Sequence, residues 1–183
     1  MHQLKNGCDV FYSSWITRNI DTIDSTSRFM GDNIVVGPKL IEIGNNCRFG
    51  KGTAITAFNS GKEKNCKIRI GSRCIFGNYN HITSSNSIII GDNLRTGTFV
   101  IITDNSHGDP KDKSMLYRHP DERPIYSKGG IVIGKNVWVG DKATILPNCT
   151  IGDYCIIGAN TVITHDVPAF SIAVGCPAKI YKR

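Results

Sequence analysis

Aliphatic residues recur every six positions along much of this chain. In the C-terminal third the register is unbroken, and a small or aliphatic residue usually fills the fifth place of each unit. Neither a helix, with its period of 3.6, nor a simple strand, with its period of 2, produces such a register. We therefore predict a three-sided solenoid in which each unit forms one short strand and one corner. The units begin at Ile133, Val139, Ile145, Ile151, Ile157 and Ile163, and their fifth positions are Val137, Ala143, Cys149, Cys155, Thr161 and Val167.

The same register returns further upstream and predicts an all-β fold of five coils. The upstream units begin at Ile43, Phe49, Ile55, Ile70, Phe76, Ile82, Ile90, Thr96 and Ile102. First and fifth positions face the interior, and the glycines that often fill the second position suit the corners. We expect residues 31–183 to form the solenoid and residues 1–30 to cap its open end, because an uncovered coil exposes unpaired strand groups. A chain of 183 residues fits one such domain.

The repeat is interrupted twice. A small insertion falls near residues 59–65, and we expect it to be a surface loop. A longer insertion, at about residues 108–130, contains three prolines and many charges, so it cannot continue the solenoid wall. Long loops in compact domains are usually functional or disordered, which makes this segment the main functional clue.

Composition excludes several classes of protein. No stretch is long and apolar enough to span a membrane and the N-terminus lacks a signal-peptide pattern, so we expect a cytoplasmic protein without stable membrane insertion. The net charge of +7 suggests an anionic partner. The basic residues are scattered along the chain, so we expect no nucleic-acid partner. The seven cysteines lack zinc-site spacing, and we expect no metal.

Two segments resemble the hexapeptide-repeat acyltransferases. They are Ile-Gly-Lys-Asn-Val-Trp at 133–138 and Gly-Cys-Pro-Ala-Lys at 175–179, and the resemblance covers roughly residues 31–183. Within that superfamily the chain is similar to galactoside and maltose acetyltransferases and to capsule or lipopolysaccharide O-acetyltransferases. The resemblance implies a left-handed parallel β-helix, although parallel crossovers are generally right-handed. It also implies acetyl-CoA as co-substrate, a sugar or glycan acceptor, and a homotrimer with active sites between neighbouring prisms.

O-acetyl transfer to a hydroxyl requires a base, and a neutral imidazole suits that role near pH 7. His107 falls at an outward position of its unit, where the long loop begins. The segment Thr-Asp-Asn-Ser-His-Gly at 103–108 resembles the place where the family carries its catalytic histidine. We predict that His107 is the general base. His119, followed by Pro120 in a stretch that also resembles galactoside acetyltransferases, is the alternative.

Further residues are assigned by their proximity in the repeat and by resemblance. The residues expected to contact the acceptor are Asn80, His81, Asp104, His119 and Trp138. The residues expected along coenzyme A are Asp141 and Ala159 beside the pantetheine arm, and Thr164, His165, Lys179 and Lys182 nearer the adenine and phosphates. His165 departs from the family, which often has lysine there.

Three other functions compete with O-acetylation. N-acetylation of an amino sugar, often nucleotide-linked, is the nearest, but such enzymes frequently carry an extra nucleotide-binding domain for which this chain has no room. A zinc hydratase similar to γ-type carbonic anhydrases would need three converging histidines, and the chain has no His-x-x-x-x-His pair. A non-catalytic binding solenoid is disfavoured by the long loop with its histidines.

Overall fold

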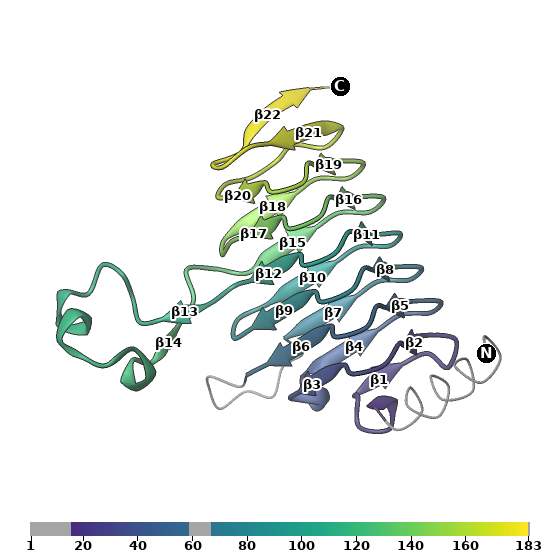
Figure 1. Ribbon diagram of the computed structural model, residues 1–183, viewed down its shortest axis with the longest axis horizontal. Helices are drawn as coiled ribbons and strands as arrows, with labels where there is room; N and C mark the ends of the chain where they lie inside the picture. The colour runs from purple at the N-terminus through teal and green to yellow at the C-terminus, as the bar shows by residue number, and fades with distance from the viewer. Residues whose placement is uncertain (1–15, 59–66, 183) are drawn as a thin grey trace.

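Three sheets form the sides of a three-sided prism, and their strands are parallel except for the final pair, β21 and β22 (Figure 1). The computed structural model describes residues 16–58 and 67–182. Sheet A contains Thr22–Ile23 (β1), Ile41–Ile43 (β4), Ile68–Ile70 (β7), Ile88–Ile90 (β10), Ile131–Ile133 (β15) and Cys149–Ile151 (β18). Sheet B contains Arg28–Phe29 (β2), Arg48–Phe49 (β5), Ile75–Phe76 (β8), Arg95–Thr96 (β11), Trp138–Val139 (β16), Ile156–Ile157 (β19), Ser171–Val174 (β21) and Lys179–Lys182 (β22). Sheet C contains Ile34–Val36 (β3), Ala54–Ala57 (β6), His81–Ser84 (β9), Ile101–Thr103 (β12), Thr144–Ile145 (β17) and Val162–Ile163 (β20).

The all-β solenoid is confirmed, but it has one more coil than the repeat predicted. Strands β1, β2 and β3 pair in parallel with β4, β5 and β6, so the first coil begins at Thr22 and not after residue 30. The repeat is hard to recognise there because Asp24 and Met30 occupy the places that glycine fills in later coils. Residues 1–15 of the expected cap and the expected loop at 59–65 lie outside the described residues.

The interior is built from the columns that the repeat predicts. Phe29, Phe49 and Phe76 stack along sheet B, with ring centroids 4.4 and 4.8 Å apart. Several fifth positions hold small buried side chains, among them the free thiols of Cys149 and Cys155. Burial raises the pKa of both thiols, so they remain protonated and serve as small apolar side chains rather than nucleophiles.

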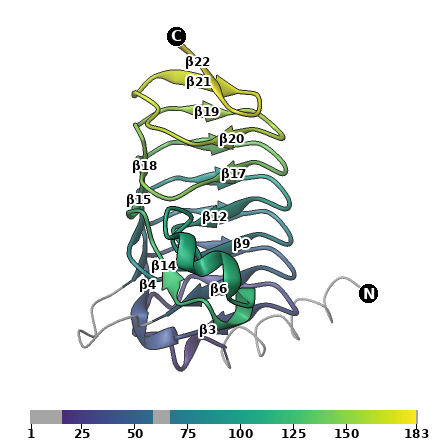
Figure 2. The ribbon, with the colours of Figure 1, turned by 90° about the vertical axis from the view of Figure 1, so that its left-hand side faces the viewer.

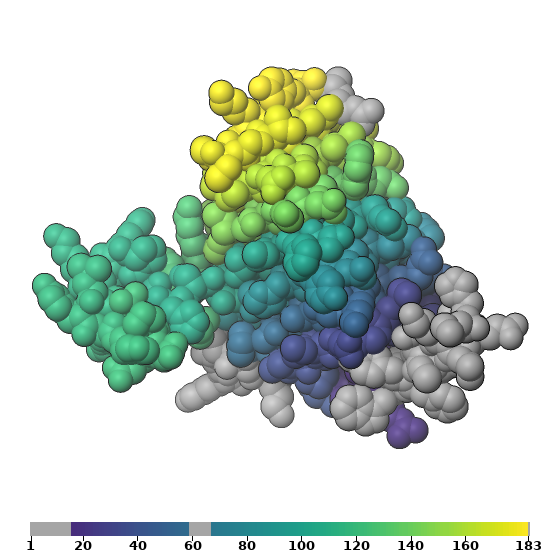
Figure 3. All heavy atoms as spheres, viewed as in Figure 1, coloured from purple at the N-terminus to yellow at the C-terminus, as the bar shows by residue number. Residues whose placement is uncertain are grey.

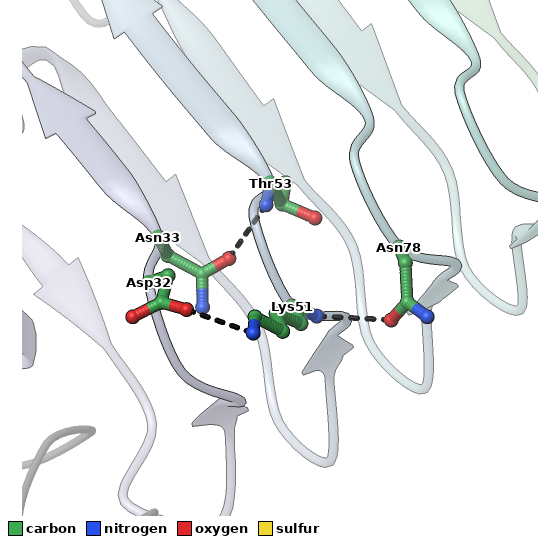
Figure 4. A network of polar contacts seen from close by, with 5 residues as sticks. All are labelled: Asp32, Asn33, Lys51, Thr53 and Asn78. Carbon is green, nitrogen blue, oxygen red and sulfur yellow. Dashed lines mark hydrogen bonds and ion pairs between the residues drawn. The ribbon is translucent and has the colours of Figure 1, made fainter.

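Side-chain amides tie neighbouring coils together at the corner between sheets B and C. Figure 4 shows the N-terminal part of this corner, where Asn33 Oδ1 accepts a hydrogen bond from the Thr53 backbone N–H at 2.8 Å. The backbone N–H of Lys51 donates to Asn78 Oδ1 at 3.0 Å, and its ammonium lies 3.1 Å from Asp32. The two amide side chains thus accept hydrogen bonds from backbone N–H groups at the corner that have no partner in the strand pairing.

The second-position glycines allow consecutive corners to approach closely. A Cβ added at Gly77 would overlap the carbonyl group of Gly97 on the next coil, and backbone atoms cannot move aside cheaply. We expect Gly77→Ala to lower the free energy of unfolding by about 1 to 3 kcal/mol, as overpacking does. Denaturant titration measures this loss. Gly158→Ala, whose added methyl would mainly meet the Val174 side chain, should cost less, and equal losses would contradict the explanation.

Candidate active site

The long insertion forms an arm, residues 104–130, that leaves the prism at the corner between sheets C and A (Figures 1 and 2). At its base Ser106–His107 (β13) and Ile125–Tyr126 (β14) pair as an antiparallel hairpin. Farther out it contains two 3-10 turns, Lys113–Tyr117 (η2) and Pro120–Glu122 (η3). Figure 3 shows the arm standing apart from the body of its own chain. The predicted loop is confirmed, and it starts four residues earlier than expected.

His107 lies in β13, at the base of the arm, and is exposed. Its neighbour across the hairpin is Ile125. Within residues 16–58 and 67–182 its imidazole has no hydrogen-bond or ion-pair partner, so both ring nitrogens are available to a substrate. The outward orientation is as predicted, but His107 belongs to the hairpin and not to the solenoid wall on which that prediction was based.

A cavity of about 270 Å³ lies between the arm and the coil above it. Its walls include Ser106 and Tyr126 from the hairpin, Leu146 and Pro147 from the corner after β17, and the side chains of Lys111 and Lys128. Ser106 and Tyr126 are paired across β13 and β14, so their neighbours His107 and Ile125 project from the opposite face of the hairpin. The sequence repeat does not predict this cavity, because the cavity depends on how the arm lies against the prism.

Asp104 was expected to contact the acceptor, and this is wrong. The residue is 0% exposed and its carboxyl group is fully engaged by its own chain. It accepts hydrogen bonds from the Ser84 hydroxyl at 2.6 Å and from the backbone N–H groups of Ser85 at 2.8 Å and Ser87 at 2.8 Å. Asn86 N–H at 3.1 Å and Asn105 Nδ2 at 3.1 Å complete the set. Asp104 therefore fastens the base of the arm to the corner that follows β9.

Asn80 was also expected to contact the acceptor, and the structure corrects this as well. The residue is 1% exposed. Its Oδ1 accepts from the Val100 backbone N–H at 2.7 Å, and its Nδ2 donates to Thr96 Oγ1 at 2.7 Å and to Gly77 O at 3.1 Å. Asn80 thus does for a later pair of coils what Asn33 does for the first pair. Its burial agrees with the fifth, inward-facing position that Asn80 occupies in the unit beginning at Phe76.

The other expected acceptor residues are exposed but lie on different parts of the molecule. His81 points outward from β9 on sheet C, and His119 caps η3, where its Nδ1 accepts from the Asp121 backbone N–H at 3.3 Å. Trp138 is 55% exposed on β16 of sheet B. In a three-sided prism sheet B lies opposite the corner between sheets C and A, so a single chain does not bring Trp138 and His107 together.

The expected coenzyme A residues divide between two edges of sheet C and the C-terminal strand. Asp141 and Ala159 are exposed on consecutive coils at the corner between sheets B and C, and Asp141 Oδ1 accepts from the Thr98 N–H at 2.7 Å. Thr164 and His165 follow β20 at the corner that carries the arm, with Thr164 Oγ1 3.0 Å from His165 Nδ1. Lys179 and Lys182 are exposed on β22, which pairs antiparallel with β21. The structure brings Asp141 and Ala159 together and leaves the other four elsewhere.

The described residues contain neither a metal-binding cluster nor a membrane-spanning helix. No group of three or more histidine, cysteine, aspartate or glutamate side chains among them is arranged to hold a metal ion. None of the helices formed by these residues has the length and apolar character that a membrane span requires.

Known proteins share both sequence and fold with this chain. Residues 130–165 match the family described as Bacterial transferase hexapeptide (six repeats). The chain is 34% identical over 146 residues to the putative lipopolysaccharide biosynthesis O-acetyltransferase WbbJ of Escherichia coli, covering 78% of this chain and 71% of that protein. It is 31% identical over 120 residues to the galactoside O-acetyltransferase of Escherichia coli, covering 63% of this chain and 54% of that protein.

Solved structures agree on the fold. AntD, an N-acyltransferase from Bacillus cereus, superposes with a TM-score of 0.76 at 18% identity over 93% of this chain and 87% of AntD. GDP-perosamine N-acetyltransferase from Caulobacter crescentus superposes with a TM-score of 0.60 at 19% identity over 86% of this chain and 57% of that one. At these identities the likeness concerns the fold alone.

The fold is a left-handed parallel β-helix, so the expected handedness is confirmed, and the similarity in sequence to named acetyltransferases identifies the protein as an acyltransferase. The chain belongs to the bacterial hexapeptide-repeat transferase family.

Proposed function

We propose that the protein transfers an acetyl group from acetyl-CoA to a hydroxyl of a sugar or surface glycan, with His107 as general base. The observation that carries the proposal is the exposed imidazole of His107, free of partners in the described chain, at the base of the arm. WbbJ and the galactoside enzyme are both named as O-acetyltransferases, which favours oxygen as the attacking atom. A cytoplasmic location goes with this proposal, because acetyl-CoA is available there.

The chemistry follows from a neutral imidazole beside the acceptor. One ring nitrogen accepts the hydroxyl proton while the oxygen attacks the thioester carbonyl. The carbon–sulfur bond then breaks, and the imidazolium returns the proton to the departing thiolate of coenzyme A. The protein needs no covalent intermediate for this direct transfer.

Sheet C offers a surface for the coenzyme. On its C-terminal coils Ile101, Thr144 and Val162 form a row of outward-facing positions. This row lies between the corner that carries Asp141 and Ala159 and the corner that carries Thr164 and His165. This strip of small and apolar side chains suits the pantetheine arm. Lys179 and Lys182, at the same end of the prism, supply cations for the phosphates.

The complete site is proposed to form between subunits of a homotrimer. At the end of the arm Tyr117 is 92% exposed and Leu116 is 71% exposed, so apolar surface there is not covered by the chain's own prism. Docking of the arm on a neighbour would cover it. The same docking would let Trp138 of one subunit face His107 of another, which one chain alone does not allow.

The alternative is N-acylation of a nucleotide-linked amino sugar. It is favoured by one observation, the resemblance of the fold to AntD, whose structure contains dTDP and 3-hydroxybutyryl-CoA. The two functions leave different products, an ester from a hydroxyl and an amide from an amine.

The test is release of free coenzyme A from acetyl-CoA in the presence of neutral sugars, glycans and amino sugars. Turnover with a hydroxyl acceptor, giving a product whose acetyl group is removed by mild base, is the expected result. A base-stable amide formed only with amino sugars would replace O-acetylation by the alternative. Binding of acetyl-CoA without turnover on any acceptor would contradict both.

A further inference from the structure

Sheet B has a row of arginines on its outer face. Arg28 is the register partner of Arg48 on the next coil, Arg48 is the partner of Ile75, and Ile75 is the partner of Arg95. All three arginines are exposed. The next residue in the row is the exposed Trp138, the partner of Arg95. The row therefore runs along the prism axis through five consecutive coils.

These three guanidinium groups have no ion-pair partner among the described residues. The acidic residues at the neighbouring corners are already engaged, since Asp32 pairs with Lys51 and both Asp92 and Asp153 accept backbone N–H groups. Sheet A provides the contrast, because its outward Arg69 pairs with Glu42 at 2.7 Å. Like charges placed directly opposite one another on adjacent strands are destabilising, so the neighbouring pair Arg28 and Arg48 weakens the fold when nothing binds it.

The spacing of the row limits what could neutralise it. Strands in a sheet lie about 4.8 Å apart, so Arg28 and Arg95, three coils apart, are separated by about 14 Å at the backbone. This is longer than a single diphosphate and fits a chain that carries several anionic groups. Guanidinium forks bind carboxylates and phosphates in a bidentate manner. The exposed indole of Trp138 offers an apolar face for a sugar ring at the end of the row.

We propose that this arginine row, Arg28, Arg48 and Arg95, binds an acidic glycan and guides it toward the acetylation site. The inference rests on the proposed function for its role in catalysis, and it names the substrate class of that function as a glycan bearing carboxylate or phosphate groups. The three arginines lie on the first, second and fourth coils, whereas the residues proposed for coenzyme A lie on the fifth coil and beyond. Binding of the glycan is therefore separable from binding of the cofactor.

The experiment measures binding of a short oligogalacturonate and of a neutral maltooligosaccharide by titration calorimetry, with no acetyl-CoA present. In Arg28→Gln/Arg48→Gln we expect the Kd for oligogalacturonate to rise about tenfold or more, as loss of charge-assisted hydrogen bonds predicts. Raising the salt concentration should weaken binding to the wild type. The matched control is Arg18→Gln/Lys39→Gln, which removes the same charge from exposed positions outside the row and should keep the wild-type Kd.

Three results would overturn the inference. The control could lose as much affinity as the row variant, or phosphatidylglycerol vesicles could bind the protein through the row while oligogalacturonate does not. The third is dissociation of the oligomer in the row variant, seen by light scattering, which would make the row a subunit interface. If neutral sugars are acetylated but oligogalacturonate does not bind, the inference fails and the proposed function stands. If oligogalacturonate binds through the row but no hydroxyl is acetylated, the glycan surface stands and the proposed function fails.

Discussion

His107→Ala should abolish most acetyl transfer while leaving acetyl-CoA binding intact. A general base contributes about 10² to 10⁴ in rate, so kcat/KM for the acceptor should fall by that factor, equivalent to about 3 to 5 kcal/mol of transition-state stabilisation. The fold should not suffer, because the side chain is exposed and has no partner in the described chain. Steady-state kinetics with the best acceptor, together with calorimetric titration of coenzyme A, measures both effects.

His119→Ala is the matched control, since it removes the second histidine of the arm. His119 caps a short 3-10 turn and its ring already accepts a backbone N–H, so we expect only a small loss of activity. The opposite pattern, full activity in His107→Ala and collapse in His119→Ala, would transfer the role of base to His119. Equal and complete losses in both variants would indicate that the arm fails to dock, and light scattering would then show an altered oligomer.

The sequence predicts the solenoid well because its register is enforced at every coil. The glycines at second positions are required by the close approach of consecutive corners, and most of the buried first and fifth positions hold apolar side chains. The first coil was missed where Asp24 and Met30 replace those glycines. The repeat can be recognised in the sequence only where the usual residue types, such as glycine at the corners, fill its positions.

The site is harder to predict because it lies where the arm interrupts the repeat. Periodicity placed His107 on the outside, and it is exposed, but it could not show that residues 106 and 107 form a hairpin with 125 and 126. For Asp104 and Asn80, proximity to the loop and resemblance suggested ligand contact. Both side chains instead accept hydrogen bonds from backbone N–H groups of neighbouring coils, and no local sequence pattern reveals those partners.

Asp104→Ala should destabilise the protein more than any other substitution of an acidic residue in the arm. It leaves the backbone N–H groups of residues 85–87 and the Ser84 hydroxyl without their acceptor inside the structure. Unpaired buried donors cost about 1 to 3 kcal/mol each and their effects are not additive, so we expect a loss of about 3 to 5 kcal/mol in the free energy of unfolding. Denaturant titration monitored by circular dichroism measures the change.

Asp121→Ala provides the comparison, because this carboxylate is exposed near the end of the same arm and should change stability by no more than about 0.5 kcal/mol. Asp104→Asn keeps one acceptor oxygen in place, so it should lose less stability than the alanine variant and remain folded for kinetics. Its KM for the acceptor should stay at the wild-type value, since the buried side chain does not reach substrate. A variant with normal stability and a raised KM would instead mean that Asp104 binds the acceptor, and that the carboxyl group leaves its buried position during the reaction.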